Sequence, residues 1–240
     1  MKNIISYLQQ HSGEILSDIK TLVAAESPSM NKAAVDRCGD VLQALFAERL
    51  GIDAEIDVQE HYGNHLKFTL GSGSDQTVVL GHFDTVWDEG ELPMREEDGK
   101  FYGPGILDMK AGLVQSIWAA RALKEHDLLA GKRIVFLCGS DEEVGSPSSS
   151  EWLSRHALGS SQVLVVEPAV AGTGALKVAR KGTGQYQIAI TGQAAHAGNN
   201  PEEGISAVQE MAHQVLFLHG LNAPDRGTTV NVGIAQGGNR

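Results

Sequence analysis

The sequence places a histidine and an aspartate two residues apart at the end of an apolar run. His82 and Asp84 follow the run 78–80, in the pattern His-Phe-Asp. In extended backbone, side chains at i and i+2 leave on the same side, so Asp84 can face the His82 ring or the same ligand. A carboxylate that accepts a hydrogen bond from one ring nitrogen fixes the tautomer and makes the other nitrogen a better metal ligand. The alternative interpretation is a buried histidine beside an aspartate that caps a loop.

Two further motifs also supply carboxylates. Asp108 follows the Gly/Pro-rich stretch 102–107 and opens a predicted helix, where a simple N-cap is the alternative because aspartate favours that position. Asp141, Glu142 and Glu143 come directly after another apolar run. Three adjacent anions repel one another unless cations or protons neutralise them. An exposed run of charge is the usual explanation of such a triplet, but the neighbouring core strand favours a metal site.

The fourth motif is Glu167-Pro168, which follows the apolar run 163–166. Each motif therefore puts a histidine or a carboxylate at a strand end or at a strand-to-helix turn. In open α/β sheets, ligands bind at the carboxyl ends of the strands, so we expect the four motifs to share one rim of one sheet. One histidine with several carboxylates suits zinc or manganese, and a metal pair there would polarise a carbonyl and activate water for hydrolysis.

The elements that must position these residues alternate between helices and apolar strands. Apolar residues at helical spacing predict two helices, one before Pro28 and one between an N-cap at Asn31 and Gly51. Continuous apolar strands that alternate with helices predict an α/β fold with a mixed, mostly parallel sheet flanked by helices. The expected strands are 52–58, 66–70, 77–81, 133–138 and 163–166, and the expected later helices are 109–125 and 150–156.

The pattern then changes, and a second, smaller domain is expected. Alternation at Tyr186, Ile188 and Ile190 predicts a strand with one solvated face. A helix over 201–219 and a strand over 230–234 are expected after it. A single helix on two strands makes a very small sheet, and the sequence ends in a turn-like stretch, so a C-terminal truncation is also expected. The predicted domains are 1–176 and 177–240.

Composition and charge exclude several classes of function. The chain has 30 acidic and 19 basic residues, a formal net charge of -11 and no basic stripe, so a nucleic-acid backbone would be repelled. The first ten residues are neither a signal peptide nor part of a stretch of roughly 20 apolar residues that could span a bilayer. We therefore expect a cytoplasmic protein without a membrane partner. Cys38 and Cys138 lack metal-type spacing and are interpreted as small core residues.

Taken in order, the four motifs resemble the co-catalytic zinc peptidase superfamily, which includes aminoacylase, succinyl-diaminopimelate desuccinylase and glutamate carboxypeptidase. The residues of 81–87 and 97–105 are most similar to the glutamate carboxypeptidase branch. The resemblance covers essentially the whole chain. The matching strings are His82-x-Asp84, Gly-Pro-Gly-x-x-Asp108-x-Lys110-x-Gly112, Asp141-Glu142-Glu143-x-Gly145-Ser146 and Glu167-Pro168.

The resemblance implies a catalytic domain that holds two zinc ions, with manganese or cobalt as metals that the same ligands accept. It makes Glu142 the general base, which takes a proton from water and passes it to the leaving amine. It gives Asp84 the task of orienting His82, and it implies a cis peptide bond between Asp108 and Met109. The implied metal ligands are His82, Asp108, Glu143 and Glu167, with Asp108 bridging the two ions.

The smaller domain resembles the first half of an α+β dimerisation lid, beginning at 192–204. In relatives, a histidine of this lid reaches the active site of the partner in a homodimer and stabilises the oxyanion. The resemblance implies that role for His196, with a structural role at a helix entry as the alternative.

The resemblance also implies a reaction, namely hydrolysis of an amide bond that releases a C-terminal amino acid, with glutamate expected, from a small peptide or N-acyl conjugate. An aminoacylase or another deacylase of the superfamily is the alternative within the same chemistry. Complete relatives continue past the lid and supply a further histidine ligand for the second ion, which no other histidine motif here replaces. A catalytically inactive, truncated metal-binding remnant is therefore the competing interpretation.

Overall fold

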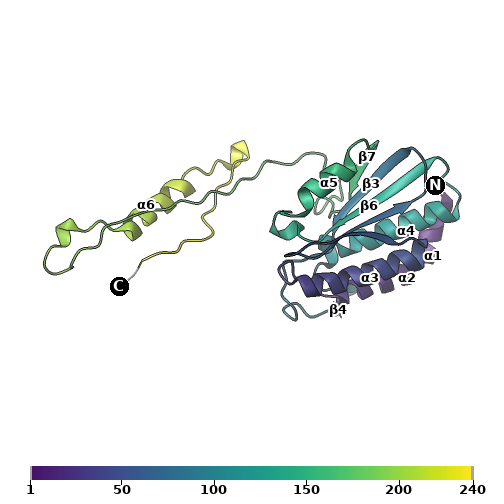
Figure 1. Cartoon of the computed structure of the whole chain (residues 1–240), viewed down its shortest axis with the longest axis horizontal. Helices are drawn as coiled ribbons and strands as arrows, with labels where there is room; N and C mark the ends of the chain where they lie inside the picture. The colour runs from purple at the N-terminus through teal and green to yellow at the C-terminus, as the bar shows by residue number, and fades with distance from the viewer. Residues whose placement is uncertain (1, 239–240) are drawn as a thin grey trace. The chain divides into compact units, whose positions relative to one another are not determined.

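The computed structural model describes residues 2–238, which form two compact units divided between Val178 and Ala179. The N-terminal unit is a sheet with helices on both of its faces (Figure 1). Its class is the predicted one, a mixed α/β fold.

The sheet of the N-terminal unit has five strands, and only β2 runs against the direction of the other four. The strands predicted for this unit are confirmed, with bounds that differ by at most two residues. Because β3 lies between β6 and β7 and parallel to both, the carboxyl ends of these three strands meet at one rim. In spatial order the strands are β1 (Ala54–Asp57), β2 (His65–Leu70), β6 (Lys132–Gly139), β3 (Asp75–His82) and β7 (Gln162–Val165).

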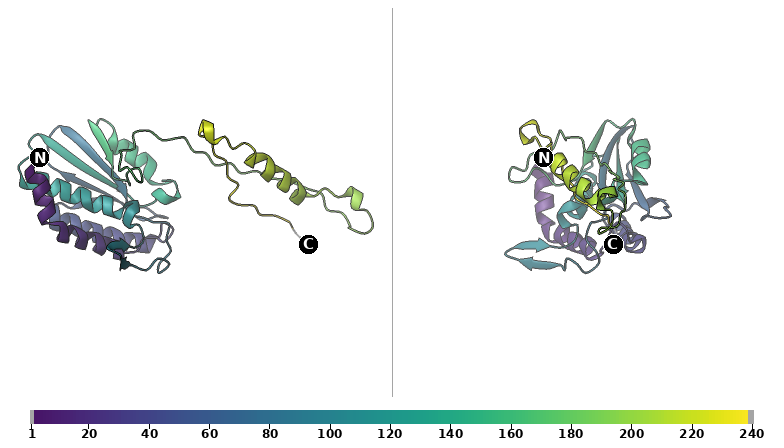
Figure 2. Two further views of the ribbon diagram at one scale, coloured as in Figure 1. Left: turned by 180° about the vertical axis from the view of Figure 1, so that it is seen from behind. Right: turned by 90° about the vertical axis from the view of Figure 1, so that its left-hand side faces the viewer.

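Helices cover both faces of this sheet, as Figure 2 also shows from behind. The larger core lies on one face, where Phe46 stacks on Phe68 at 3.6 Å between ring centroids. On the other face, Trp152 packs against Val78 and Leu137. The first face carries α1 (Lys2–Gln10), α2 (Ser12–Ala24), α3 (Lys32–Leu50) and α4 (Ala111–Glu125), and the second carries α5 (Ser149–Ala157).

The ends of α3 confirm the two capping signals in the sequence. The Asn31 side chain accepts a hydrogen bond from the backbone of Ala34, and Gly51 takes the left-handed conformation that terminates many helices. Three helices are joined by the Asp18 carboxylate, which accepts hydrogen bonds from Arg49 and from the Trp118 indole. The helical layer that supports the rim is therefore tied together by a buried polar contact as well as by apolar packing.

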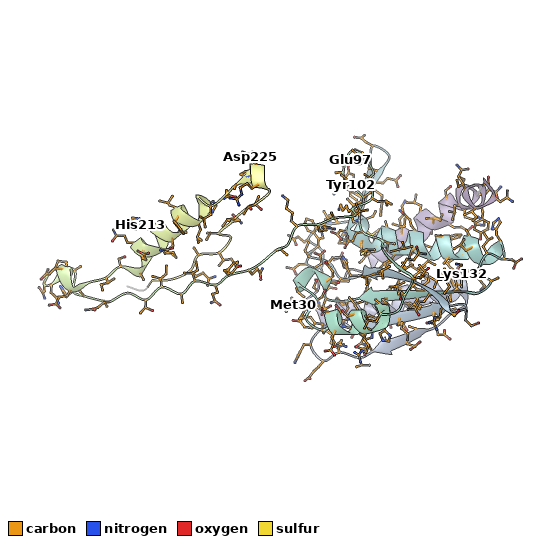
Figure 3. The ribbon with its side chains drawn as sticks, turned by 90° about the horizontal axis from the view of Figure 1, so that it is seen from above. Met30, Glu97, Tyr102, Lys132, His213 and Asp225 are labelled. Carbon is orange, nitrogen blue, oxygen red and sulfur yellow. The ribbon has the colours of Figure 1, made fainter. Side chains whose placement is uncertain are left out.

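Two elements were not predicted, helix α1 and the two-stranded ribbon of β4 (Arg95–Glu97) and β5 (Lys100–Tyr102). The apolar residues of α1 are interrupted and few, although its Tyr7 packs on the core. The ribbon is rich in charge and lacks apolar alternation, and the Asp98-Gly99 turn between its strands is its one sequence signal. Glu97 and Tyr102 mark the two strands in Figure 3.

The C-terminal unit contains the predicted helix, but in two pieces. A single turn at Pro201–Glu203 precedes α6 (Ala207–His219), because the Ser206 side chain caps the Gln209 N–H and starts a new helix. The first part of the predicted helix 201–219 is therefore wrong. The second part is confirmed as α6, the long helix of this unit in Figure 1.

The two strands predicted in this unit, around 186–190 and 230–234, do not form as ladders in the described residues. Alternation alone does not make a strand, because a neighbouring strand must satisfy the backbone groups. Tyr186 is 93% exposed, and the backbone N–H and C=O of Val230 bond instead to the Asn222 side chain. The last predicted turn, at 237–240, lies partly outside the described residues.

No helix within residues 2–238 is both long and apolar enough to cross a bilayer.

Candidate metal centre

Three strand ends bring the predicted residues to one rim of the sheet. His82 is the last residue of β3, and it pairs in register with Gly139 at the end of β6. Glu142 and Glu143 follow β6 in a single helical turn, and Glu167 comes two residues after β7. We call His82, Asp108, Glu142, Glu143 and Glu167 the rim cluster.

Asp108 reaches the rim from a distorted turn, η1 (Ile106–Lys110), at the start of α4. Asp108 and Met109 have non-helical backbone angles, and the peptide bond between them is cis, as predicted. The turn can lie against the end of β7 because residue 112 is glycine: a Cβ there would stand 2.0 Å from the Val166 carbonyl oxygen. Asp108 is therefore delivered by backbone geometry, and the N-cap alternative does not describe it.

The carboxylates of the rim cluster converge on one imidazole nitrogen. His82 Nε2 is 3.2 Å from Asp108 Oδ1, 3.4 Å from Glu167 Oε1 and 3.8 Å from Glu142 Oε2. Two overlapping sets have ligand atoms within 4.8 Å of one another: His82 with Asp108 and Glu143, and His82 with Glu142 and Glu167. The histidine is buried, whereas Asp108 and Glu142 are about half exposed, so the cluster opens to solvent on its carboxylate side.

The other ring nitrogen of His82 faces the chain of Asp84. Nδ1 lies 3.1 Å from the Asp84 backbone oxygen and 3.3 Å from Oδ1 of its side chain. A carbonyl oxygen can only accept, so Nδ1 carries a proton. When the ring is neutral, the lone pair is therefore on Nε2, the nitrogen that points into the rim cluster. This geometry is the one in which an imidazole binds a metal.

The electrostatics of the metal-free cluster show an excess of negative charge. Burial raises the pKa of Glu143 to about 7, and the repulsion of Asp108 adds to this rise while His82 opposes it. The pKa values of Asp108 and Glu142 are also raised, in each case chiefly by burial. For His82 burial works against the charged form, but hydrogen bonds to Asp84 and Glu167 raise the pKa to about 11. These shifts show that the cluster favours added positive charge, whether from protons or from a cation.

These residues fit divalent metal ions. The donor set consists of one imidazole nitrogen and the four carboxylates of the rim cluster, three of them within 4 Å of that nitrogen, and zinc, manganese and cobalt all bind such donors. Ions would remove the mutual repulsion that adds to the rise in the carboxylate pKa values. The chemistry of the donor set, and not any single distance, makes this rim a candidate metal centre.

A buried polar network that was not predicted holds the loop after β6. The Asp141 carboxylate accepts hydrogen bonds from the Ser148 hydroxyl and backbone N–H, both at 2.7 Å. His65 joins the network through the Ser148 and Ser140 hydroxyls at 3.1 and 2.9 Å. Asp141 therefore closes the loop that presents Glu142, although the sequence offered no signal for His65.

His196 lies in the C-terminal unit, in the segment 193–205. Its Nδ1 accepts hydrogen bonds from the backbone N–H groups of Gly198 and Asn199, both at 3.1 Å. A neutral ring held in this way carries its proton on Nε2. The side chain is therefore a preorganised hydrogen-bond donor.

Removal of metal should make stability depend on pH through Glu143. Its pKa in the folded chain, about 7, is above its ordinary value of 4.5, so between these values the folded chain holds a proton that the unfolded chain has released. By linkage, the free energy of unfolding falls as pH rises through this window. We expect urea unfolding in chelator to show wild type losing stability relative to Glu143→Gln between pH 5 and pH 7.5. A constant difference over that range would mean that Glu143 titrates normally.

The fold and the rim define an α/β protein of the metallohydrolase type, and comparison with known proteins gives the family. Residues 78–232 match the model of "Peptidase family M20/M25/M40". The chain belongs to this family, which confirms the predicted resemblance, and by family it is a metallopeptidase or amidohydrolase.

Curated relatives extend beyond this chain. It is 30% identical over 234 residues to carboxypeptidase G2 of Pseudomonas sp. (strain RS-16), which covers 94% of the chain and 55% of that protein. It is 31% identical over 214 residues to acetylornithine deacetylase of Proteus mirabilis (strain HI4320), covering 84% of the chain and 54% of the relative. The chain thus spans about half the length of the curated relatives it matches.

Solved structures share the fold. A tripeptidase from Staphylococcus aureus superposes with a TM-score of 0.67 at 22% identity, covering 94% of this chain and 61% of that one. Aminopeptidase PepT from Bacillus cereus superposes with a TM-score of 0.64 at 23% identity and the same coverage.

Proposed function

We propose that the protein is a metal-dependent hydrolase that cleaves an amide bond and releases a C-terminal amino acid, glutamate in the first instance, from a peptide or N-acyl conjugate. The observation that carries the proposal is the convergence of three carboxylates, those of Asp108, Glu142 and Glu167, on Nε2 of His82 at the strand rim, with Glu143 beside them. Similarity to carboxypeptidase G2 supports the release of a C-terminal residue, and glutamate is the substrate side chain to test first.

In this proposal, the rim cluster binds two zinc ions, with manganese or cobalt as alternatives. His82, Asp108 and Glu167 would hold one ion, and Asp108 and Glu143 would hold the other. When bound, such ions polarise the substrate carbonyl and lower the pKa of water. Asp108 could contribute to both ions because its carboxylate lies 3.2 Å from His82 and belongs to the set that includes Glu143.

Glu142 is assigned the proton transfers. It is half exposed, and its raised pKa suits a group that accepts a proton from water and returns it to the leaving amine. Burial is the main cause of that raised pKa, and Glu167 adds to it. Asp84 keeps the His82 ring in the orientation that directs Nε2 into the cluster.

The C-terminal unit is proposed to be the first part of a lid through which two copies associate, with residues 1–176 as the catalytic domain and 177–240 as the lid. His196 would donate a hydrogen bond from Nε2 to the oxyanion of the substrate. The support is its fixed tautomer, since both Nδ1 hydrogen bonds come from backbone donors.

One observation favours a second function, deacylation of an amino acid that is not acidic. A hollow of about 490 Å³ beside Glu143 is lined by the apolar side chains of Met30, Val86 and Val144 and by the carboxylates of Asp88 and Glu89. No basic residue lines it within the described part of the chain. Arg37 pairs with Glu89 at 2.8 Å, but the charge of Asp88 would still disfavour a free carboxylate there, whereas an aliphatic or cationic side chain would be accepted.

A substrate series separates these functions. Zinc-loaded protein is offered a C-terminal glutamyl conjugate, N-acetylglutamate and N-acetylornithine, and release of the amino acid is measured. Turnover of the glutamyl conjugate supports the first function, and preference for N-acetylornithine supports the second. Zinc-loaded protein that cleaves none of the three would contradict both, and would favour the metal-binding remnant.

A further inference from the structure

The Asp84 side chain is a fully buried carboxylate that receives donors on both oxygens. Oδ1 accepts from the backbone N–H of Glu142 at 3.2 Å and lies 3.3 Å from His82 Nδ1. Oδ2 accepts from the backbone N–H of Glu143 at 3.2 Å and from the Ser29 hydroxyl at 2.7 Å. One carboxylate therefore joins the end of β3 to the loop after β6, and Ser29 is the partner that comes from neither.

Ser29 is placed by backbone pairing between distant segments. The Ser29 N–H donates to the Thr85 carbonyl, and the Thr85 N–H donates to the Ser27 carbonyl, at 3.1 and 2.8 Å. This short parallel pairing brings Ser29 beside Asp84, where it is 5% exposed. The hydroxyl also lies 3.1 Å from the Thr85 carbonyl, but it has one proton, and the charged and nearer Asp84 oxygen is the stronger acceptor.

We propose that Ser29 is a positioning residue of the metal centre, whose hydroxyl fixes the Asp84 carboxylate in the orientation that holds His82 and the Glu142–Glu143 loop at once. The inference rests on the proposed metal site and adds to it a residue outside the four motifs.

Loss of the Ser29 hydroxyl would affect both proposed ions, because the single Asp84 carboxylate positions His82 and the Glu142–Glu143 loop together. Without the Ser29 hydroxyl, Oδ2 keeps the long bond to the Glu143 N–H and loses its shortest one. A buried carboxylate that is short of a donor can turn to find another, and that movement would displace the donors bound to Oδ1. Ligands on β3 and on the loop after β6 would then lose their alignment together. Partners of this kind change metal affinity by about 10- to 100-fold when removed.

Ser27 offers a matched control. It is a fully buried serine two residues away, and its hydroxyl donates to the Phe83 carbonyl, not to Asp84. Ser27→Ala therefore removes a buried hydroxyl from the same segment without touching the carboxylate.

The test is a zinc competition titration of the full chain against a chromophoric chelator, together with the visible spectrum of the cobalt-loaded protein. We expect Ser29→Ala to weaken zinc binding by about 10-fold or more and to alter the cobalt spectrum, Ser29→Thr to restore both, and Ser27→Ala to match wild type. If Ser29→Ala does not fold, Ser29→Cys repeats the test with a weaker donor of similar size.

Equal affinity of Ser29→Ala and wild type would overturn the inference and leave the proposed metal site standing. Equal weakening by the Ser27 and Ser29 variants would overturn it too, because packing alone would explain both. A wild-type chain that binds no zinc would reject the metal site itself, and the role of Ser29 with it.

Discussion

Glu142→Gln should reduce the turnover of the metal-loaded protein by about 10²- to 10⁴-fold, because an amide cannot accept the proton that the carboxylate takes from water. The side chain keeps its size and its half-exposed position, and the backbone N–H that bonds to Asp84 is unchanged. The loss should fall on kcat, and zinc affinity should stay within a few-fold of wild type. Steady-state kinetics with the substrate that wild type prefers, beside a zinc titration, measures both.

Glu151→Gln is a suitable control, since Glu151 is an exposed glutamate in the first turn of α5 and outside the rim cluster. It should leave turnover unchanged. If Glu142→Gln instead abolished zinc binding, Glu142 would be a ligand, which the overlapping set of His82, Glu142 and Glu167 permits geometrically. Full turnover of Glu142→Gln would remove it from the mechanism.

The second large effect concerns stability. An ion that binds only the folded chain stabilises it, by about 2.7 kcal/mol at a free concentration of 100 Kd. We therefore expect zinc to raise the midpoint temperature of unfolding of wild type. Zinc should not raise it in His82→Asn, because that variant lacks the imidazole on which the carboxylates converge. Thermal unfolding with and without zinc measures the difference.

His126→Asn controls for the loss of an imidazole as such, because that ring hydrogen-bonds to the Ala122 carbonyl of α4, packs edge-on against Tyr7 and lies outside the rim cluster. It should keep the full zinc effect. A zinc effect that persists undiminished in His82→Asn would place the bound ion elsewhere in the chain.

Much of the rim could be predicted because apolar runs in this sequence show where the strands end. Apolar runs identified β3, β6 and β7, and the residues directly after each run are the histidine and carboxylates that meet in space. That those three strands run parallel to one another then follows from the helices that connect them. Asp108 was found by its Gly/Pro-rich turn, and the family resemblance supplied the cis peptide bond that follows it.

The remaining parts depend on contacts that leave no local pattern. Ser29 comes from a loop between two helices and reaches Asp84 through pairing across 55 residues. The sequence around His65 indicates only the start of a strand. The folded chain is needed to show that its ring bonds to the hydroxyls of two serines. Alternation suggested strands around 186–190 and 230–234, but a strand needs a hydrogen-bonded neighbour that a periodic pattern cannot guarantee.

The central claim is that the rim cluster binds metal, and the most direct test is anomalous diffraction from crystals of the chain grown with zinc. We expect an anomalous peak for zinc at about 2.0–2.1 Å from His82 Nε2, with carboxylate oxygens of the cluster at about 2.0–2.2 Å from the same peak. Zinc found only at other positions, with Nε2 of His82 still facing protonated carboxylates, would contradict it.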